Sequence, residues 1–149
     1  DLFLPYRRGT GNLYCREHFQ VARDRLEPGG VFVQWLPLYQ MTEREFGVIA
    51  KTMLTAFPQV SLWRGTFRPG AEIAALMGHA DAAPLPACRL DEESAKRQAV
   101  QGATHRDMHT VRLPINEQTV LFFYAGNVTA AAELFEQYPL NTDDMPVIE

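Results

Sequence analysis

A nearly continuous apolar run at residues 31–36 is the feature that most constrains the fold. Only Gln34 interrupts it. Such a run is typical of a strand that is covered on both faces, as in the sheets of α/β proteins. Upstream, residues 13–26 carry apolar side chains at helical spacing, Asn12 is placed to cap their start, and residues 28–30 (Pro-Gly-Gly) end them. The sequence therefore predicts an amphipathic helix followed by a buried strand.

Further along the chain, Thr42 and Glu45 have the spacing of a capping box at the start of a second helix, which Pro58 ends. Residues 60–63 and 73–77 then predict two strands that pair as a hairpin. Together with a strand end at residues 1–5, this order favours a parallel α/β sheet with an antiparallel hairpin at its edge.

The rest of the chain differs from this α/β core, which we place at residues 1–79. Residues 80–117 are proline-rich, then charged, then polar, and they predict a helical insertion or cover. Residues 118–149 predict two short helices, at 119–125 and 129–135, and a polar tail. The 149 residues thus form a single domain. Because the chain opens on what reads as a strand end, we expect a piece of a longer protein.

Composition excludes several classes of protein. With 46% hydrophobic and 21% charged residues, the chain has the make-up of a packed domain. Its net charge of −4 provides no basic field for a nucleic acid, so we expect no nucleic-acid partner. Two cysteines, Cys15 and Cys88, give neither a disulfide framework nor zinc-site spacing. The apolar runs are too short to span a bilayer, and we expect a cytoplasmic location.

Four stretches carry a family resemblance: residues 1–5 (Asp-Leu-Phe-Leu-Pro), 9–14 (Gly-Thr-Gly-Asn-Leu-Tyr), 28–35 (Pro-Gly-Gly-Val-Phe-Val-Gln-Trp) and 140–149 (Leu-Asn-Thr-Asp-Asp-Met-Pro-Val-Ile-Glu). In these stretches the chain resembles the spermidine and spermine synthases, the polyamine aminopropyltransferases, and above all their divergent bacterial branch. The resemblance implies the second half of a Rossmann-like sheet of the S-adenosylmethionine-dependent methyltransferase type. The nucleoside-holding glycine turn would lie in the half that is absent here.

The resemblance also implies a reaction and partners. An amine of a polyamine would attack decarboxylated S-adenosylmethionine, the co-substrate, and release methylthioadenosine; no metal takes part. Asp1 matches the catalytic aspartate of the family's Asp-x-x-Asp-Pro motif, while Leu4 stands where that motif has a second aspartate. Family members form homodimers, and many are fused to membrane helices or helical repeats, which would place the full-length protein at a membrane.

Three candidate substrate-binding residues belong to the predicted strand and the segment after it. Gln34 matches a family glutamine and can hydrogen-bond an amine. Its alternative role is that of a buried amide bonded to neighbouring backbone. Trp35 and Tyr39 can stack on an ammonium group, or they can simply pack at the rim of the core.

Asp143 and Asp144 form the other candidate substrate-binding pair, because two adjacent carboxylates attract a polycation. The alternative is turn chemistry, in which Asn141, Thr142 and their neighbours bond their own backbone before Pro146. Both interpretations stay open at this point.

Two further readings of the function also remain. Leu4 in place of an aspartate favours a non-catalytic domain that binds a polyamine or a nucleoside. A methyltransferase using intact S-adenosylmethionine is the third, because one fold serves many chemistries. His105 and His109 have the i, i+4 spacing of metal ligands, although a solvated helix face explains them better.

Overall fold

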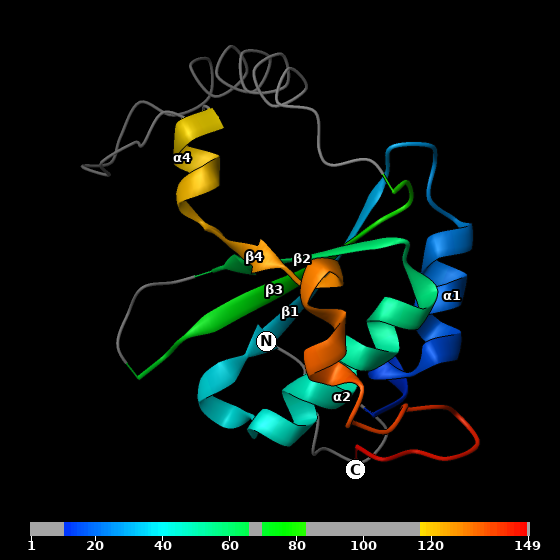
Figure 1. The fold of residues 1–149 in the computed structure, drawn as a ribbon. Coiled ribbons are helices and arrows are strands. Elements are labelled where there is room, and N and C mark those ends of the chain that lie inside the picture. The colour runs from blue at the N-terminus through cyan, green and yellow to red at the C-terminus, as the bar shows by residue number, and fades with distance from the viewer. Residues whose placement is uncertain (1–10, 66–69, 83–116, 149) are drawn as a thin grey trace, which may run out of the picture.

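The computed structural model describes residues 11–65, 70–82 and 117–148, and Figure 1 shows their arrangement. Its elements, in chain order, are η1 (Gly11–Tyr14), α1 (Arg16–Asp24), β1 (Val31–Pro37), η2 (Leu38–Gln40), α2 (Glu43–Ala56), β2 (Gln59–Arg64), β3 (Ile73–His79), α4 (Glu117–Phe122), β4 (Tyr124–Asn127) and η3 (Thr129–Phe135). The helices and strands predicted between residues 13 and 79 are confirmed. The strand predicted at residues 1–5 and most of the predicted insertion, with Cys88, His105 and His109, lie outside the described residues.

The four described strands form one sheet in the order β1-β3-β2-β4, and every neighbouring pair is antiparallel. The predicted β2–β3 hairpin is confirmed, but in the described sheet it lies between β1 and β4 rather than at the edge, and the described strands form antiparallel pairs where the prediction had a parallel sheet. Since β1 and β2 are both antiparallel to β3, they run in the same direction, and α2 connects them. Hydrophobic patterning identifies strands without fixing their order, which explains the error.

The prediction of a helix over residues 119–125 is correct only for its first part. Helix α4 ends at Phe122, and Tyr124–Asn127 forms β4, which pairs with β2. Trp63 lies opposite Tyr124, and the register shifts between Leu62 and Trp63. Pairing with a distant strand here overrides the local pattern, as is common for short strands.

Local sequence explains how the two main helices begin. In α2, the Thr42 hydroxyl accepts from the Glu45 N–H at 3.2 Å and the Glu45 carboxylate accepts from the Thr42 N–H at 2.6 Å, which confirms the capping box. In α1, Cys15 rather than Asn12 is the N-cap, because its sulfur accepts from the His18 N–H at 3.3 Å. Asn12 belongs to η1 instead.

The core lies between one face of the sheet and the helices that cover it (Figure 1). Its fully buried members include Leu36, Leu76 and Val60 from the strands and Ile49 and Met53 from α2. The segment after η3 also packs against α2. A Cβ atom at Gly47 would overlap the ring of Tyr138, so a glycine is required there. Among the described residues, no helix has the length and apolar character to cross a bilayer.

Candidate functional site

The start of α1, the end of β1 and the C-terminal tail lie toward one edge of the fold (Figure 1). Helix α1 precedes β1, and the chain turns back between them, which brings the helix start to the side where β1 ends. The Arg16 N–H donates to the Asn141 carbonyl at 2.9 Å, which ties the tail to the first turn of α1. In open, mostly parallel α/β sheets, ligands bind outside the carboxyl ends of the strands. Of the described strands, β1 and β2 share one direction, while β3 and β4 run the opposite way. The edge toward which β1 ends is therefore a candidate for a site.

Asn141 holds the tail in position, and its side chain is completely buried. Its amide nitrogen donates to the Gly11 carbonyl at 2.9 Å, and its amide oxygen accepts from the Val147 N–H at 2.8 Å. Its backbone N–H donates to the hydroxyl of Thr52, in α2, at 3.0 Å. The Asn141 side chain thus bonds the backbone of distant η1 and of the end of the tail itself, and its backbone N–H bonds α2.

The tail approaches the start of η1 closely. A Cβ atom at Gly11 would overlap the carbonyl oxygen of Ile148. Only glycine leaves room for the two backbones to pass at this distance. The Asn141 hydrogen bond to the Gly11 carbonyl joins the same two segments.

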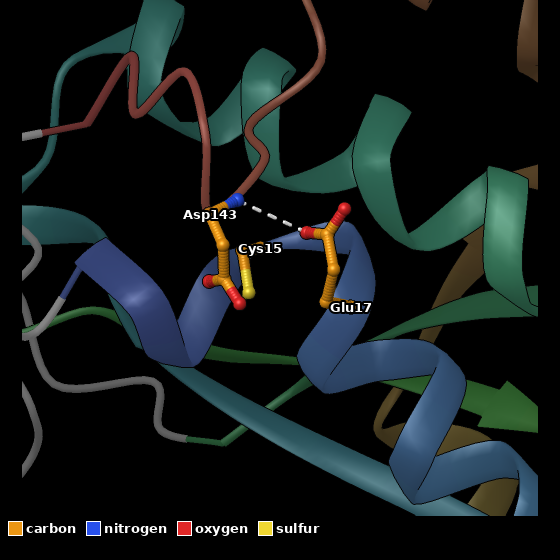
Figure 2. A group of neighbouring side chains, drawn as sticks. All are labelled: Cys15, Glu17 and Asp143. Carbon is orange, nitrogen blue, oxygen red and sulfur yellow. Dashed lines mark hydrogen bonds between the residues drawn. The ribbon is translucent and has the colours of Figure 1, made fainter.

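This docking brings Asp143 against the first turn of α1, beside Cys15 and Glu17 (Figure 2). The Asp143 N–H donates to the Glu17 carboxylate at 3.1 Å. One potential ligand atom from each of the three side chains lies within 4.8 Å of the others. Asp144, the next residue, is exposed. Arg16 forms an ion pair with Glu17 at 3.2 Å and offsets part of the negative charge.

Backbone donors and burial set the protonation of this cluster. Backbone N–H groups, first that of Glu17 itself and then that of Asp143, lower the pKa of the Glu17 carboxyl despite some desolvation. Burial, followed by the neighbouring Asp143 carboxylate, raises the pKa of the Cys15 thiol to about 11. At neutral pH the Glu17 carboxylate therefore lies near a protonated Cys15 thiol.

The protonated thiol argues against a nucleophilic role for Cys15. Nucleophilic attack needs a thiolate, which this environment disfavours. Cys15 instead donates to the Asn12 carbonyl at 2.9 Å and caps α1, which is a structural role.

The other predicted site residues lie on or just after β1. Gln34 is partly buried, and its amide nitrogen donates to the Trp35 carbonyl at 3.3 Å, a backbone contact of the kind its structural alternative requires. Trp35 and Tyr39 are each 46% exposed. Within the described part of the chain, no hydrogen bond or ion pair joins these three residues to Asp143 or Asp144.

The polar tail divides into structural and accessible residues. Asn141 is a buried anchor, and Thr142 makes a turn, since its hydroxyl accepts from the Met145 N–H at 3.1 Å. The turn interpretation therefore holds for these two. Asp143 and Asp144 are exposed, so their carboxylates are accessible to a ligand. Asp1, the predicted catalytic residue, lies outside the described residues.

Sequence reasoning missed a buried polar group on the sheet. The Ser61 hydroxyl lies 2.9 Å from Nε2 of His79, and the indole N–H of Trp63 donates to the same hydroxyl at 2.8 Å. Burial lowers the pKa of His79. No motif links these residues, because only the β2–β3 register brings them together.

Comparison with known proteins does not identify a family for this chain. No protein-family model matches it, and no curated protein matches it in sequence.

Proposed function

We propose that this chain is part of a spermidine synthase-like enzyme, which transfers an aminopropyl group from decarboxylated S-adenosylmethionine to a polyamine. The observation that carries the proposal is the docking of the Asp143–Asp144 tail on the first turn of α1, toward the edge where β1 ends. Ligands of open α/β sheets bind at this edge, and exposed carboxylates there attract a polycationic amine.

The strand arrangement supports the Rossmann-like part of the proposal. Strands β1 and β2 share a direction and are connected through α2, which is the strand–helix–strand unit of doubly wound sheets. Strand β3 is antiparallel to both. Antiparallel strands at the end of an otherwise parallel sheet are common in such folds. The described sheet is thus compatible with the second half of a methyltransferase-like domain.

The proposed chemistry is an in-line displacement. The amine nitrogen forms a bond to the methylene carbon next to the sulfonium, the carbon–sulfur bond breaks, and its electron pair leaves with methylthioadenosine. The amine must be deprotonated to attack, and Asp1 is the proposed acceptor of that proton. Gln34, Trp35 and Tyr39 would orient the amine, and Asp143 and Asp144 would supply negative charge. We assign no residue of this chain to the nucleoside.

A product assay tests this function. The natural protein that contains this chain would be supplied with decarboxylated S-adenosylmethionine and a panel of di- and polyamines, with products followed by mass spectrometry. An aminopropylated amine and methylthioadenosine in equal amounts are expected. A methylated acceptor formed from S-adenosylmethionine would replace the proposal with a methyltransferase. Binding of polyamine or nucleoside without any product would replace it with a binding domain.

A further inference from the structure

A chain of side-chain contacts crosses the sheet from β3 to β4. The Ser61 hydroxyl lies 2.9 Å from Nε2 of His79, and the indole N–H of Trp63 donates to the same oxygen at 2.8 Å. Ser61 and His79 are both buried. Trp63 in turn meets Tyr124 edge to face, with the ring centroids 5.2 Å apart. Side chains therefore connect His79 in β3, through β2, to Tyr124 in β4.

The direction of these hydrogen bonds follows from what each group can donate. An indole N–H can only donate, so the Ser61 oxygen is its acceptor. The Ser61 hydroxyl proton then has His79 as its acceptor, because Ser61 has no third side-chain partner in the described part of the chain. Nε2 of His79 accepts only when it carries no proton, which places the ring proton of neutral His79 on Nδ1. Burial lowers the pKa of His79 below its ordinary value of 6.5 and so favours this neutral form.

The groups that share a sheet face with His79 carry no charge at neutral pH. Val31 of β1 and Gln59 of β2 lie directly opposite His79, and neither titrates. Alternate residues along a strand share a face, and β4 contributes Tyr124, which ionises only near pH 10. Asp81, two residues after His79, instead accepts at 2.7 Å from a backbone N–H in the turn before β1. Among the described residues of this face, His79 is thus the group that titrates closest to neutral pH.

We propose that His79, Ser61 and Trp63 form a proton-sensitive relay, through which protonation of His79 loosens the contact between Trp63 and Tyr124 of β4. Protonation turns Nε2 into a charged donor that points at the oxygen already accepting from Trp63. The Ser61 hydroxyl proton must then rotate away from His79, toward the indole N–H or toward a position without a bonded acceptor. Either orientation weakens the hold on Trp63, because a buried hydroxyl without an acceptor costs free energy. This inference does not depend on the proposed aminopropyl transfer.

NMR of the tryptophan indole N–H groups provides a direct test in the protein that contains this chain. Trp63 lies in the relay, and Trp35, the other tryptophan of the chain, does not. Trp35→Phe and Trp63→Phe assign the two signals. Between about pH 8 and about pH 5, we expect the Trp63 signal to follow one titration with its midpoint below 6.5. Its exchange with water should rise about fivefold relative to the intrinsic rate. A Trp63 signal that moves no more than that of Trp35 would overturn the proposal.

The contact with β4 has its own readout. The nuclear Overhauser effects between the rings of Trp63 and Tyr124 should weaken over the same pH range, because the indole is less firmly held. If these effects keep their full strength while the Trp63 signal titrates, protonation does not reach β4 and the proposal is wrong.

Variants show whether the signal travels through the relay. His79→Gln keeps a hydrogen-bonding side chain that does not titrate, so the Trp63 signal should lose its pH dependence. The matched control is His18→Gln in α1, which should leave the Trp63 titration unchanged. Ser61→Ala removes the middle group and serves if His79→Gln folds poorly: the His79 ring protons should still titrate while the Trp63 signal stays in place. A Trp63 titration that persists in His79→Gln or Ser61→Ala, or that is lost in His18→Gln, would contradict the relay.

Discussion

At the scale of single residues, Asn141 is the side chain on which the tail most depends. Removing its amide in Asn141→Ala leaves the buried Gly11 carbonyl and the partly buried Val147 N–H without this partner. Unsatisfied buried groups of this kind cost about 1–3 kcal/mol each. We therefore expect the free energy of unfolding, measured by urea denaturation, to fall by about 3 kcal/mol.

The control for Asn141→Ala is Asn127→Ala. The Asn127 side chain also accepts a backbone hydrogen bond, from the Ala130 N–H at 3.0 Å, but it does so at the surface. Its loss should cost about 1 kcal/mol or less, because water replaces the missing partner. If both variants lose the same free energy of unfolding, the burial of Asn141 does not determine its contribution to stability.

A larger residue at position 11 tests how closely the tail approaches η1, because it changes only the space between the two backbones. In Gly11→Ala the new Cβ would overlap the Ile148 carbonyl, so one backbone must move. Such overpacking typically costs about 1–3 kcal/mol, which thermal denaturation would detect. Gly126→Ala is the matched control, since its Cβ would meet nothing within 4 Å. A Gly11→Ala protein as stable as the Gly126→Ala protein would contradict the described docking.

At the scale of secondary-structure elements, the capping box determines how α2 begins. Thr42→Ala removes the hydroxyl that accepts from the Glu45 N–H and should destabilise the protein by about 1 kcal/mol. Thr55→Ala changes an exposed threonine of the same helix, whose hydroxyl donates to the Thr52 carbonyl, and should cost less. Chemical denaturation of both variants checks the difference.

The stability of the folded protein depends on pH through His79, a residue of strand β3. Burial holds the pKa of His79 below its ordinary value of 6.5, so the unfolded chain binds this proton more readily than the folded chain. The stability linked to His79 is therefore complete above pH 6.5 and is lost as the pH falls from 6.5 toward the folded pKa. We expect the fall in melting temperature over this window to be smaller in His79→Gln. An identical pH profile would mean that His79 is not the group responsible.

Some helices and strands can be predicted from their local sequence, and others cannot. The helix at residues 43–56 and strands β1, β2 and β3 follow from local patterns, because capping residues and apolar periodicity act within a few positions. Strand β4 could not be predicted this way, since its residues pair with β2 from more than 60 positions away. The cap of α1 was misassigned to Asn12 because a cysteine rarely takes that role.

At the scale of the whole molecule, strand order and tail docking form the edge at which we propose that the amine binds. Neither was evident in the sequence. Strand β3 lies between β1 and β2 through two sets of long-range pairings, and Asn141 reaches Gly11 across 130 positions. The adjacent carboxylates of Asp143 and Asp144 predict a candidate site, but the position of Asp143 beside α1 depends on the three-dimensional contacts of Asn141. Asp1 remains a sequence-based expectation.

The central claim of this account is that the docked tail attracts an amine to this edge. Isothermal titration of spermidine into the natural protein measures this directly, comparing the wild type with the double variant Asp143→Asn/Asp144→Asn. Both substitutions keep size and remove charge, and the Asp143 N–H bond to Glu17 is retained because it comes from the backbone. Glu133→Gln, which changes an exposed acid in η3, is the control. We predict about tenfold weaker binding in the double variant and an unchanged affinity in the control. The same affinity in all three proteins would contradict the claim.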